Sequence, residues 1–173
     1  MQNFEKTVAM YALSLSNMLI VNVWAKSFGT FEGTQYSILT KIMDMSIKMF
    51  KQESIKTILF CLRDFNEDID NIQNIHEQLK KEVGKIWDDI KKPANLSKHP
   101  YTKFFDIQLH TIRKYKPANT ANFVEDVATL RRRMTDSTDP KYQFKMFEAS
   151  YTLPLCDLPT LSKNVWTAII ENK

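Results

Sequence analysis

Glycine is scarce in this sequence, and the patterns that hold nucleotide phosphates are missing. Only three glycines occur, and none of them precedes a Lys-Ser or Lys-Thr pair. The G-x-x-x-x-G-K-[ST] loop, whose backbone N–H groups cradle phosphates, is therefore absent from the sequence. The D-x-x-G switch pattern found near a γ-phosphate is absent as well. The sequence supplies no cradle for phosphates and predicts no catalytic residue.

Cysteines and long apolar runs are also few. The two cysteines, Cys61 in an apolar stretch and Cys156 in a late loop, favour a reduced environment over a disulfide scaffold. Cys61 is interpreted as a small buried hydrophobe. No apolar run reaches the roughly 18 residues of a membrane-spanning helix, so we predict no transmembrane segment. Asn3, Glu5 and Lys6 interrupt the start of the chain, which therefore predicts an amphipathic helix and no signal peptide.

The charge is mildly basic. Lys and Arg total 24 against 20 acidic residues, a net charge of +4 that is too small and too dispersed to predict a nucleic-acid partner. The run Arg131–Arg133 lies at a predicted helix end, where we interpret it as a solvated face that complements the helix dipole. Binding of phosphate or nucleic acid by this run is the weaker alternative. No metal site is predicted, because the three histidines have no metal-ligand spacing.

The apolar residues alternate between strand-like runs and helical periodicity. Strands are predicted over 18–24, 57–64 and 104–110. Helices are predicted over 4–15 and 34–50, from a capping box of Asp70 and Gln73 to Pro93, around 123–134, and over 162–170. Trp87 and Trp166 are interpreted as core residues. Because strand–helix–strand units cross over with a right hand, the strands should be parallel. We therefore predict an α/β fold, a partial doubly wound parallel sheet with helices on both faces.

The segment Thr57–Asp64 is the most informative stretch. Its apolar and β-prone residues run directly into Arg63 and Asp64, so a buried strand should present two charged side chains at its carboxyl end. Ligands bind at that end in open α/β sheets. A carboxylate there can accept both the N1–H and the exocyclic amine of guanine, whereas adenine presents an acceptor at the same edge. On this stretch alone, a simple turn or helix cap at Asp64 is the favoured interpretation.

The wider sequence resembles the second part of the G domain in the root-hair-defective and Sey-type GTPases. These are plant, fungal and protist counterparts of atlastin, related to guanylate-binding proteins within the dynamin superfamily. The resemblance follows the chain in order and covers nearly all of it. It is carried by Gln2–Lys6, Tyr11–Ser14, Leu19–Trp24, Leu39–Lys41, Leu59–Asp64, Lys85–Asp88, Lys92-Pro93, Phe104–Asp106, Asn164–Trp166 and Asn172-Lys173.

This resemblance implies roles for four residues. Arg63 and Asp64 match the family's guanine-recognition pair, so that Asp64 would contact the base edge and the stem of Arg63 would pack near the base. The segment 111–114 falls where the family has a Leu-Pro-His-Lys-like sequence in a loop that covers the base. Arg113 and Lys114 are therefore implied as base-covering residues, although this chain lacks the Pro and the His.

The resemblance also implies a function for the longer protein. Residues 1–173 would form part of a G domain without its N-terminal phosphate-binding loop and switches. GTP would be the substrate, with Mg²⁺ bound by residues outside this chain. G domains would pair as homodimers on the cytosolic face of the endoplasmic reticulum membrane, and GTP hydrolysis would drive membrane fusion into a tubular network. Membrane anchors would lie in other segments.

An alternative remains open for the isolated chain. It could be a truncated or degenerate fragment without GTP hydrolysis, acting at most as an interaction module, or the product of an incomplete gene model. This alternative predicts an exposed strand edge and exposed apolar faces, because half of a doubly wound sheet would be missing.

Overall fold

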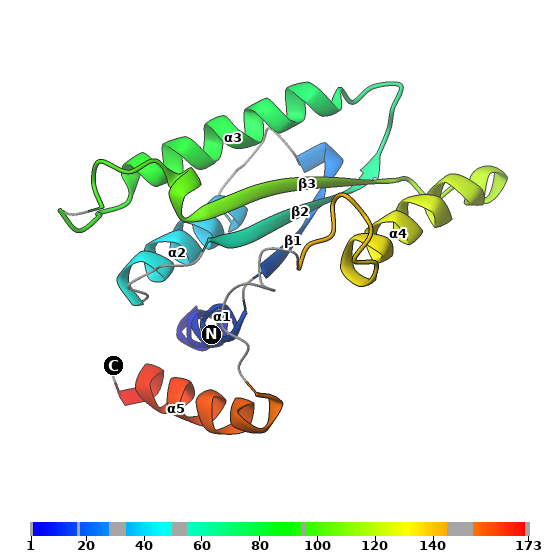
Figure 1. Cartoon of the computed structure of the whole chain (residues 1–173). Coiled ribbons are helices and arrows are strands. Elements are labelled where there is room, and N and C mark those ends of the chain that lie inside the picture. Colours follow the sequence, from blue (N-terminus) through cyan, green and yellow to red (C-terminus); the bar gives the residue numbers. More distant parts are fainter. Residues whose placement is uncertain are drawn as a thin grey trace.

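The structure is a computed structural model that describes residues 2–16, 18–27, 34–49, 55–94, 96–144 and 154–171 (Figure 1). The strands are β1 (Met18–Trp24), β2 (Lys56–Phe65) and β3 (Phe105–Arg113). The main helices are α1 (Gln2–Leu15), α2 (Thr34–Met49), α3 (Ile72–Asp89), α4 (Thr120–Thr135) and α5 (Leu158–Glu171), with short 3₁₀ turns at Ala25–Ser27, Tyr101–Lys103, Pro117–Asn119 and Leu155–Asp157. The predicted end of the second helix at Phe50 lies outside the described residues, as do Asn172 and Lys173.

The three strands form a parallel sheet in the order β1-β2-β3. Phe60 in the central strand pairs with Val21 on one side and Leu109 on the other. Residues 56–62 of β2 are all buried, as expected for a parallel strand that is covered on both faces. The predicted α/β fold with a partial parallel sheet is confirmed.

One face of the sheet packs against α2 and α3. Alternate strand residues, such as Val23, Leu62 and Phe105, form a single hydrophobic cluster with the apolar sides of these two helices. Trp87 of α3 lies in this cluster, where its ring stacks on Phe104 with centroids 5.4 Å apart and its Nε1–H donates to the carbonyl of His99 at 2.9 Å. The prediction of Trp87 as a core residue is confirmed.

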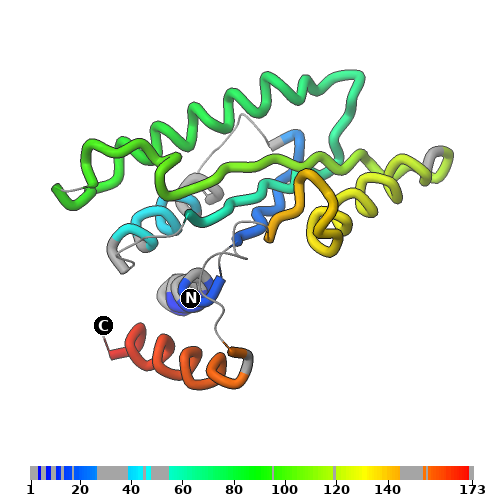
Figure 2. Tube along the Cα trace, in the orientation of Figure 1, coloured from blue at the N-terminus to red at the C-terminus, as the bar shows by residue number. Residues whose placement is uncertain are grey.

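Helix α4 approaches the opposite face beside β3, where His110 contacts the carbonyl oxygen of Asp126 at 3.0 Å. Helices therefore cover both faces, as predicted. Helices α1 and α5 lie side by side (Figure 2), and Tyr11 meets Trp166 edge to face with ring centroids 5.3 Å apart. Trp166 is 38% exposed, so its assignment to the core was wrong. Its ring packs between neighbouring helices at the surface.

Two predicted boundaries differ from the structure. Asn71, and not Asp70, caps α3, because its side chain accepts hydrogen bonds from the backbone N–H groups of Gln73 and Asn74 at 3.0 and 3.1 Å. Asp70 instead accepts a hydrogen bond from the N–H of Asn66 at 2.8 Å and closes the preceding turn. The third strand extends to Arg113, because the end of β2 continues to pair with it.

The interpretation of Arg131–Arg133 as a solvated run was wrong for one residue. Arg131 and Arg132 are exposed, but Arg133 is only 4% exposed. Its guanidinium turns toward β3, where it donates to the side-chain oxygen of Gln108 at 2.5 Å. Cys61 is buried, as predicted. Within the described part of the chain, no helix is long and apolar enough to cross a membrane.

Candidate functional site

Asp64 has an unusual backbone conformation at the end of β2. Arg63 pairs with Ile112 and Phe65 pairs with Arg113, so Asp64 is an extra residue in a β-bulge. Its φ is 56°, and among the described residues it is the one non-glycine residue with positive φ. Such a conformation is tolerated better by aspartate than by most residues, and it persists only where the surrounding structure holds it. The bulge takes the Asp64 side chain out of the regular strand alternation.

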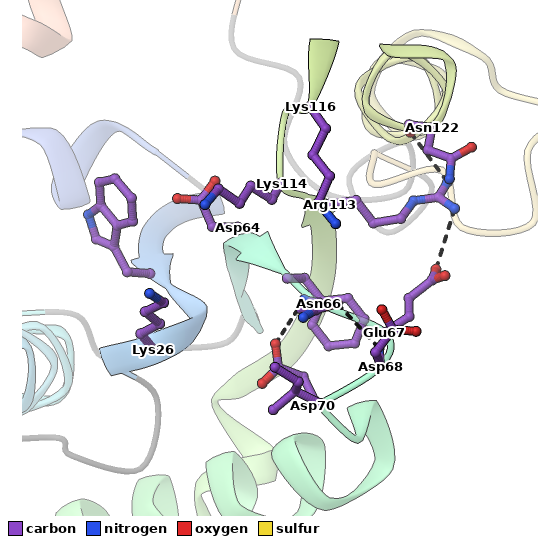
Figure 3. A pocket seen from close by; sticks show the side chains of 13 residues that line it. Lys26, Asp64, Asn66, Glu67, Asp68, Asp70, Arg113, Lys114, Lys116 and Asn122 are labelled. Carbon is purple, nitrogen blue, oxygen red and sulfur yellow. Dashed lines mark hydrogen bonds and ion pairs between the residues drawn. The ribbon is translucent and has the colours of Figure 1, made fainter. Parts of the chain in front are cut away.

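Asp64 lines a pocket of about 770 Å³ where the three strands end (Figure 3). Trp24 and Lys26 contribute the wall that follows β1. The segment from Asp64 to Asp70 forms the wall beyond β2, and Arg113, Lys114, Lys116 and Asn122 form the wall beyond β3. The pocket occupies the position at which open parallel sheets bind ligands, because all of the strands point their carboxyl ends toward it.

The turn after Asp64 is held by its own hydrogen bonds. The carbonyl of Asn66 accepts from the N–H groups of Ile69 and Asp70 at 3.0 and 2.7 Å, while the carboxylate of Asp70 bonds back to the N–H of Asn66. The side-chain oxygen of Asn66 accepts from the N–H of Asp68 at 3.3 Å. This closed turn fixes one wall of the pocket next to Asp64.

Arg63 is associated with the pocket through Trp24. The two residues are register partners on neighbouring strands, and the Arg63 guanidinium carbon lies 4.6 Å from the centre of the Trp24 ring. This distance is within the range of a cation–π contact. Arg63 does not line the pocket itself, whereas Trp24, which it covers, does.

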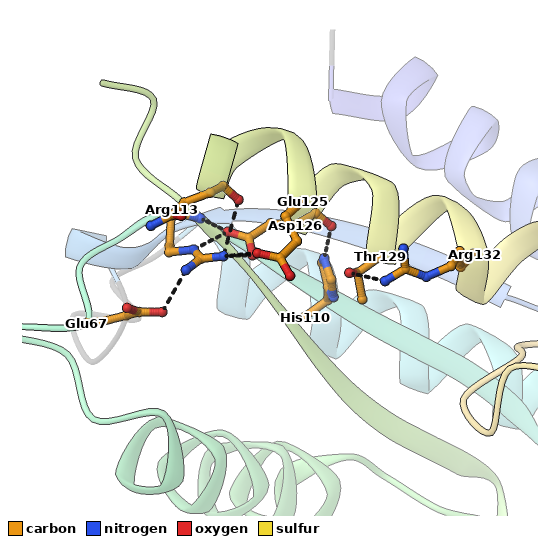
Figure 4. A network of polar contacts seen from close by, with 8 residues as sticks. Glu67, His110, Arg113, Glu125, Asp126, Thr129 and Arg132 are labelled. Carbon is orange, nitrogen blue, oxygen red and sulfur yellow. Dashed lines mark hydrogen bonds and ion pairs between the residues drawn. The ribbon is translucent and has the colours of Figure 1, made fainter. Parts of the chain in front are cut away.

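Arg113 is engaged in a network with α4 (Figure 4). Its Nη2 and Nε donate to the two carboxylate oxygens of Asp126 at 2.8 and 2.9 Å, and its backbone N–H donates to the same carboxylate at 2.8 Å. Glu125 and Glu67 lie 3.3 and 3.4 Å from the guanidinium. The hydrogen bond to Asp126 raises the pKa of Arg113 above its ordinary value. Arg113 thus ties the turn after β2 and the end of β3 to α4.

The carboxylate at the centre of this network is stabilised in its charged form. Partial burial opposes ionisation of Asp126, but its hydrogen bonds from Arg113 outweigh that effect, so the pKa of Asp126 lies below its ordinary value. The Arg113–Asp126 pair at the centre of the network is therefore charged at neutral pH. Lys114, the next residue after Arg113, points toward Asp64 (Figure 3).

The structure thus brings three of the four residues singled out from the sequence, Asp64, Arg113 and Lys114, to the lining of one pocket. Trp24 and Asn122 also line it and were not predicted. Trp24 could have been found from its position at the end of the first predicted strand, because parallel strands end at a common edge. Asn122 carried no comparable signal in the sequence.

No metal-binding cluster is present in the part of the chain that the structure describes. There, no group of three or more His, Cys, Asp and Glu residues could hold a metal ion. The acidic residues near the pocket instead have roles in the turn and in the Arg113 network. Mg²⁺ is therefore not assigned a site in these residues.

A protein-family model and the similar individual proteins indicate the same family. The model of the root hair defective 3 GTP-binding protein (RHD3) GTPase domain matches residues 1–173. The chain is 30% identical over 169 residues to Protein SEY1 homolog 2 of Paramecium tetraurelia, covering 98% of this chain and 22% of that protein. It is 32% identical over 173 residues to Protein SEY1 of Yarrowia lipolytica, covering 99% and 18% of the respective chains.

The chain thus spans about a fifth of the length of these relatives. Its match to the family model nevertheless extends from the first residue to the last. The three-stranded parallel sheet flanked by helices is consistent with part of a G domain. The chain belongs to the RHD3 GTPase domain family.

Proposed function

We propose that the pocket at the strand ends binds the guanine base of GTP and that Asp64 selects guanine over adenine. The observation that carries this proposal is the β-bulge that holds Asp64 at a φ of 56° in the pocket lining. A strained conformation at a ligand-binding edge of a sheet supports a functional constraint on that residue. Family membership supports GTP as the nucleotide.

The chemistry follows from hydrogen-bond complementarity. The two oxygens of the Asp64 carboxylate accept hydrogen bonds from the N1–H and the 2-amino group of guanine. Adenine has an unprotonated N1 and no 2-amino group, so the carboxylate meets an acceptor and loses both bonds. Lys114 points toward Asp64, and its aliphatic stem can cover the plane of the base. Trp24, held under Arg63, provides an aromatic surface at the opposite wall.

In the longer protein we propose that this region is the base-recognising part of a dynamin-like GTPase. Hydrolysis would use a phosphate-binding loop, switches and Mg²⁺ ligands that do not belong to the described residues. We further propose that the G domains form homodimers and that the protein acts in homotypic fusion and tubular organisation of endoplasmic reticulum membranes, from their cytosolic face. The support for these finer proposals is the family membership of the chain.

A second candidate is that the isolated chain binds a partner without hydrolysing GTP. β1 is an edge strand in the described sheet, and its side chains Ile20 and Trp24 are 49% and 50% exposed. Exposed apolar groups at a sheet edge favour contact with another polypeptide. GTP hydrolysis by the purified 173-residue chain at an ordinary enzymatic rate would contradict this candidate.

Base binding can be tested directly on the 173-residue chain. The chain has three tryptophans, and each contributes one indole N–H group that can be followed in ¹H–¹⁵N spectra. We expect guanosine diphosphate to shift the Trp24 signal while leaving the Trp87 signal of the buried core in place. Adenosine diphosphate carries the same phosphates but the wrong base edge, so it is the matched control. Equal shifts with both nucleotides would contradict base recognition at this pocket.

A further inference from the structure

The guanidinium of Arg113 joins three segments that border the pocket containing Asp64 (Figure 4). Its Nη1 lies 3.4 Å from a carboxylate oxygen of Glu67, in the turn after β2. Its Nη2 donates to the carbonyl oxygen of Asn122 at 3.3 Å and to the carboxylate of Asp126 at 2.8 Å, both in α4. Arg113 itself is the last residue of β3. One side chain therefore connects the turn after β2, the end of β3 and the first turns of α4.

Each of the three guanidinium nitrogens of Arg113 has an acceptor within the chain. Nε and Nη2 donate to the two oxygens of Asp126, and Nη1 faces Glu67. A base that contacted this guanidinium would have to displace one of these charge-assisted contacts. The neighbouring Lys114, by contrast, is exposed and points toward Asp64 (Figure 3). The two adjacent cations of the pocket lining therefore have different surroundings.

The main chain at Arg113 is linked to the bulge at Asp64. Phe65, directly after the bulge, is the register partner of Arg113. The N–H of Arg113 donates to Asp126 at 2.8 Å, and the N–H of Lys114 donates to the carbonyl oxygen of Phe65 at 3.3 Å. A displacement of Arg113 relative to α4 would therefore be passed to the backbone next to Asp64.

Asp126 anchors this arrangement from outside the pocket lining. Its carboxylate accepts three hydrogen bonds from Arg113, and its carbonyl oxygen contacts Nε2 of His110 at 3.0 Å. Because Asp126 does not border the pocket, an effect of its carboxylate on ligand binding has to be transmitted by the groups that it holds.

The contact with Asp126 is better shielded from solvent than the other contacts of the guanidinium. The side chains of Arg113 and Asp126 are 23% and 16% exposed. Those of Glu67 and Glu125 are 64% and 69% exposed, so water and salt weaken their attraction for Arg113. The Arg113–Asp126 pair is therefore the main tie between the end of β3 and α4.

We propose that Arg113 is a positioning residue for base recognition, which acts through Asp126 and Glu67 and does not itself contact the base. This role depends on the guanine binding proposed for Asp64. The pair with Asp126 fixes the end of β3 against α4, and the contact with Glu67 holds the turn that follows Asp64. Asp64 and Lys114 then meet the base in a fixed arrangement, so less conformational freedom is lost on binding. The base-covering role implied by the family resemblance is left to Lys114.

A double-mutant cycle on the binding of guanosine diphosphate tests this role. In the 173-residue chain, Arg113→Met and Asp126→Asn should each weaken binding about tenfold, and the double variant should bind little more weakly than either single variant. The losses should not add, because both changes break the same contact. Additive losses in calorimetric titrations, or ordinary affinity in Asp126→Asn beside weak binding in Arg113→Met, would show direct contact of Arg113 with the nucleotide and overturn the proposal. Ordinary affinity in both single variants would overturn it as well.

Two further variants make the cycle specific. Arg113→Lys keeps a cation but cannot bond to both oxygens of Asp126 in the same way, so its loss of affinity should be intermediate. It is also the milder change if Arg113→Met does not fold. Arg132→Met is the matched control, because Arg132 is an exposed arginine of α4 that donates to Thr129 and does not line the pocket. Equal weakening in Arg132→Met would reduce the effect to net charge and overturn the assignment.

A readout without nucleotide separates this role from guanine binding itself. In ¹H–¹⁵N spectra of the free chain, Asp126→Asn should shift the backbone amide signals of Asp64 and Glu67, and Arg132→Met should not. Unshifted signals of Asp64 and Glu67 would overturn the positioning role even where guanosine diphosphate binds normally. Shifted signals in a chain that binds no guanosine diphosphate would instead contradict the guanine site and, with it, a role for Arg113 in base recognition.

Discussion

Arg113 and Asp126 form a two-pronged ion pair, with Nη2–Oδ1 and Nε–Oδ2 distances of 2.8 and 2.9 Å. The same carboxylate also accepts the backbone N–H of Arg113 at 2.8 Å. Because Arg113 is the last residue of β3 and Asp126 lies on α4, the pair holds the helix at the end of the strand. Lys114 and Asn122, which line the pocket, are positioned by the segments that this pair connects.

Removal of the charge from Asp126 should loosen this wall of the pocket. Asp126→Asn keeps the shape of the side chain but weakens its charge-assisted hydrogen bonds, and we expect a loss of about 1–2 kcal/mol in the free energy of unfolding. Urea unfolding measures the change. Glu125→Gln removes a neighbouring exposed charge of the same network and should change stability far less. A similar loss in both variants would argue against the Arg113–Asp126 pair as the main anchor.

Because φ at Asp64 is positive, glycine and alanine substitutions at this position should have the reverse of their usual order of stability. Glycine adopts a φ of 56° without a steric penalty, whereas alanine does not, so Asp64→Gly should be more stable than Asp64→Ala by about 1 kcal/mol. At an ordinary strand position alanine would be the more stable of the two. Urea unfolding of the two variants measures the difference, and greater stability of the alanine variant would contradict the bulge geometry.

Trp24 should contribute to base binding, because its ring lines the pocket and is packed against Arg63. Trp24→Ala removes the aromatic surface at the pocket wall, and we expect guanosine diphosphate to bind about three- to tenfold more weakly. Isothermal titration calorimetry on the chain measures this change. Trp166→Ala is a suitable control, since Trp166 is also partly exposed but packs against Tyr11 away from the pocket lining. Unchanged affinity in Trp24→Ala would remove Trp24 from the site.

Lys56 gives a prediction for alkaline pH. Burial at the start of β2 lowers the pKa of its ammonium group to about 8, from 10.5. The folded state therefore releases this proton at a lower pH than the unfolded state, so the contribution of Lys56 to the free energy of unfolding should rise between pH 8 and 10.5. Over this pH range, Lys56 should add roughly 3 kcal/mol to the free energy of unfolding.

The variant Lys56→Met isolates this contribution, because methionine fills similar space without a titrating group. Urea unfolding at pH 8 and at pH 10.5 should show a smaller rise for the variant than for the wild type. Lys91→Met, at an exposed position, should keep the wild-type rise. An identical rise in Lys56→Met and wild type would mean that another group titrates in this range.

The elements of the sheet were predictable because their signals are local. The apolar run Met18–Trp24 coincides with β1, and the predicted strand Thr57–Asp64 lies within β2. The position of Asp64 at the carboxyl ends of the strands was also predictable, because it follows an apolar run in a strand–helix–strand unit whose strands are parallel. The bulge at Asp64 could not be predicted, because it arises from the pairing of β2 with β3.

The sequence was less informative where side chains meet across elements. Arg133 is part of an arginine run at a helix end, and local sequence gives no reason for it to be buried when Arg131 and Arg132 are exposed. Its burial depends on contacts with Gln108 and Leu109 in β3. The exposure of Trp166 likewise depends on how α5 packs beside α1.

The most direct test of guanine recognition is the nucleotide preference of Asp64→Asn. The asparagine oxygen can still accept the N1–H, but its amide group donates to the 2-carbonyl of xanthine and faces the 2-amino group of guanine unfavourably. Calorimetric titrations with guanosine and xanthosine diphosphates should therefore show that the wild type prefers guanosine and the variant prefers xanthosine. An unchanged preference for guanosine diphosphate in Asp64→Asn would contradict the assignment of Asp64 as the base-reading residue.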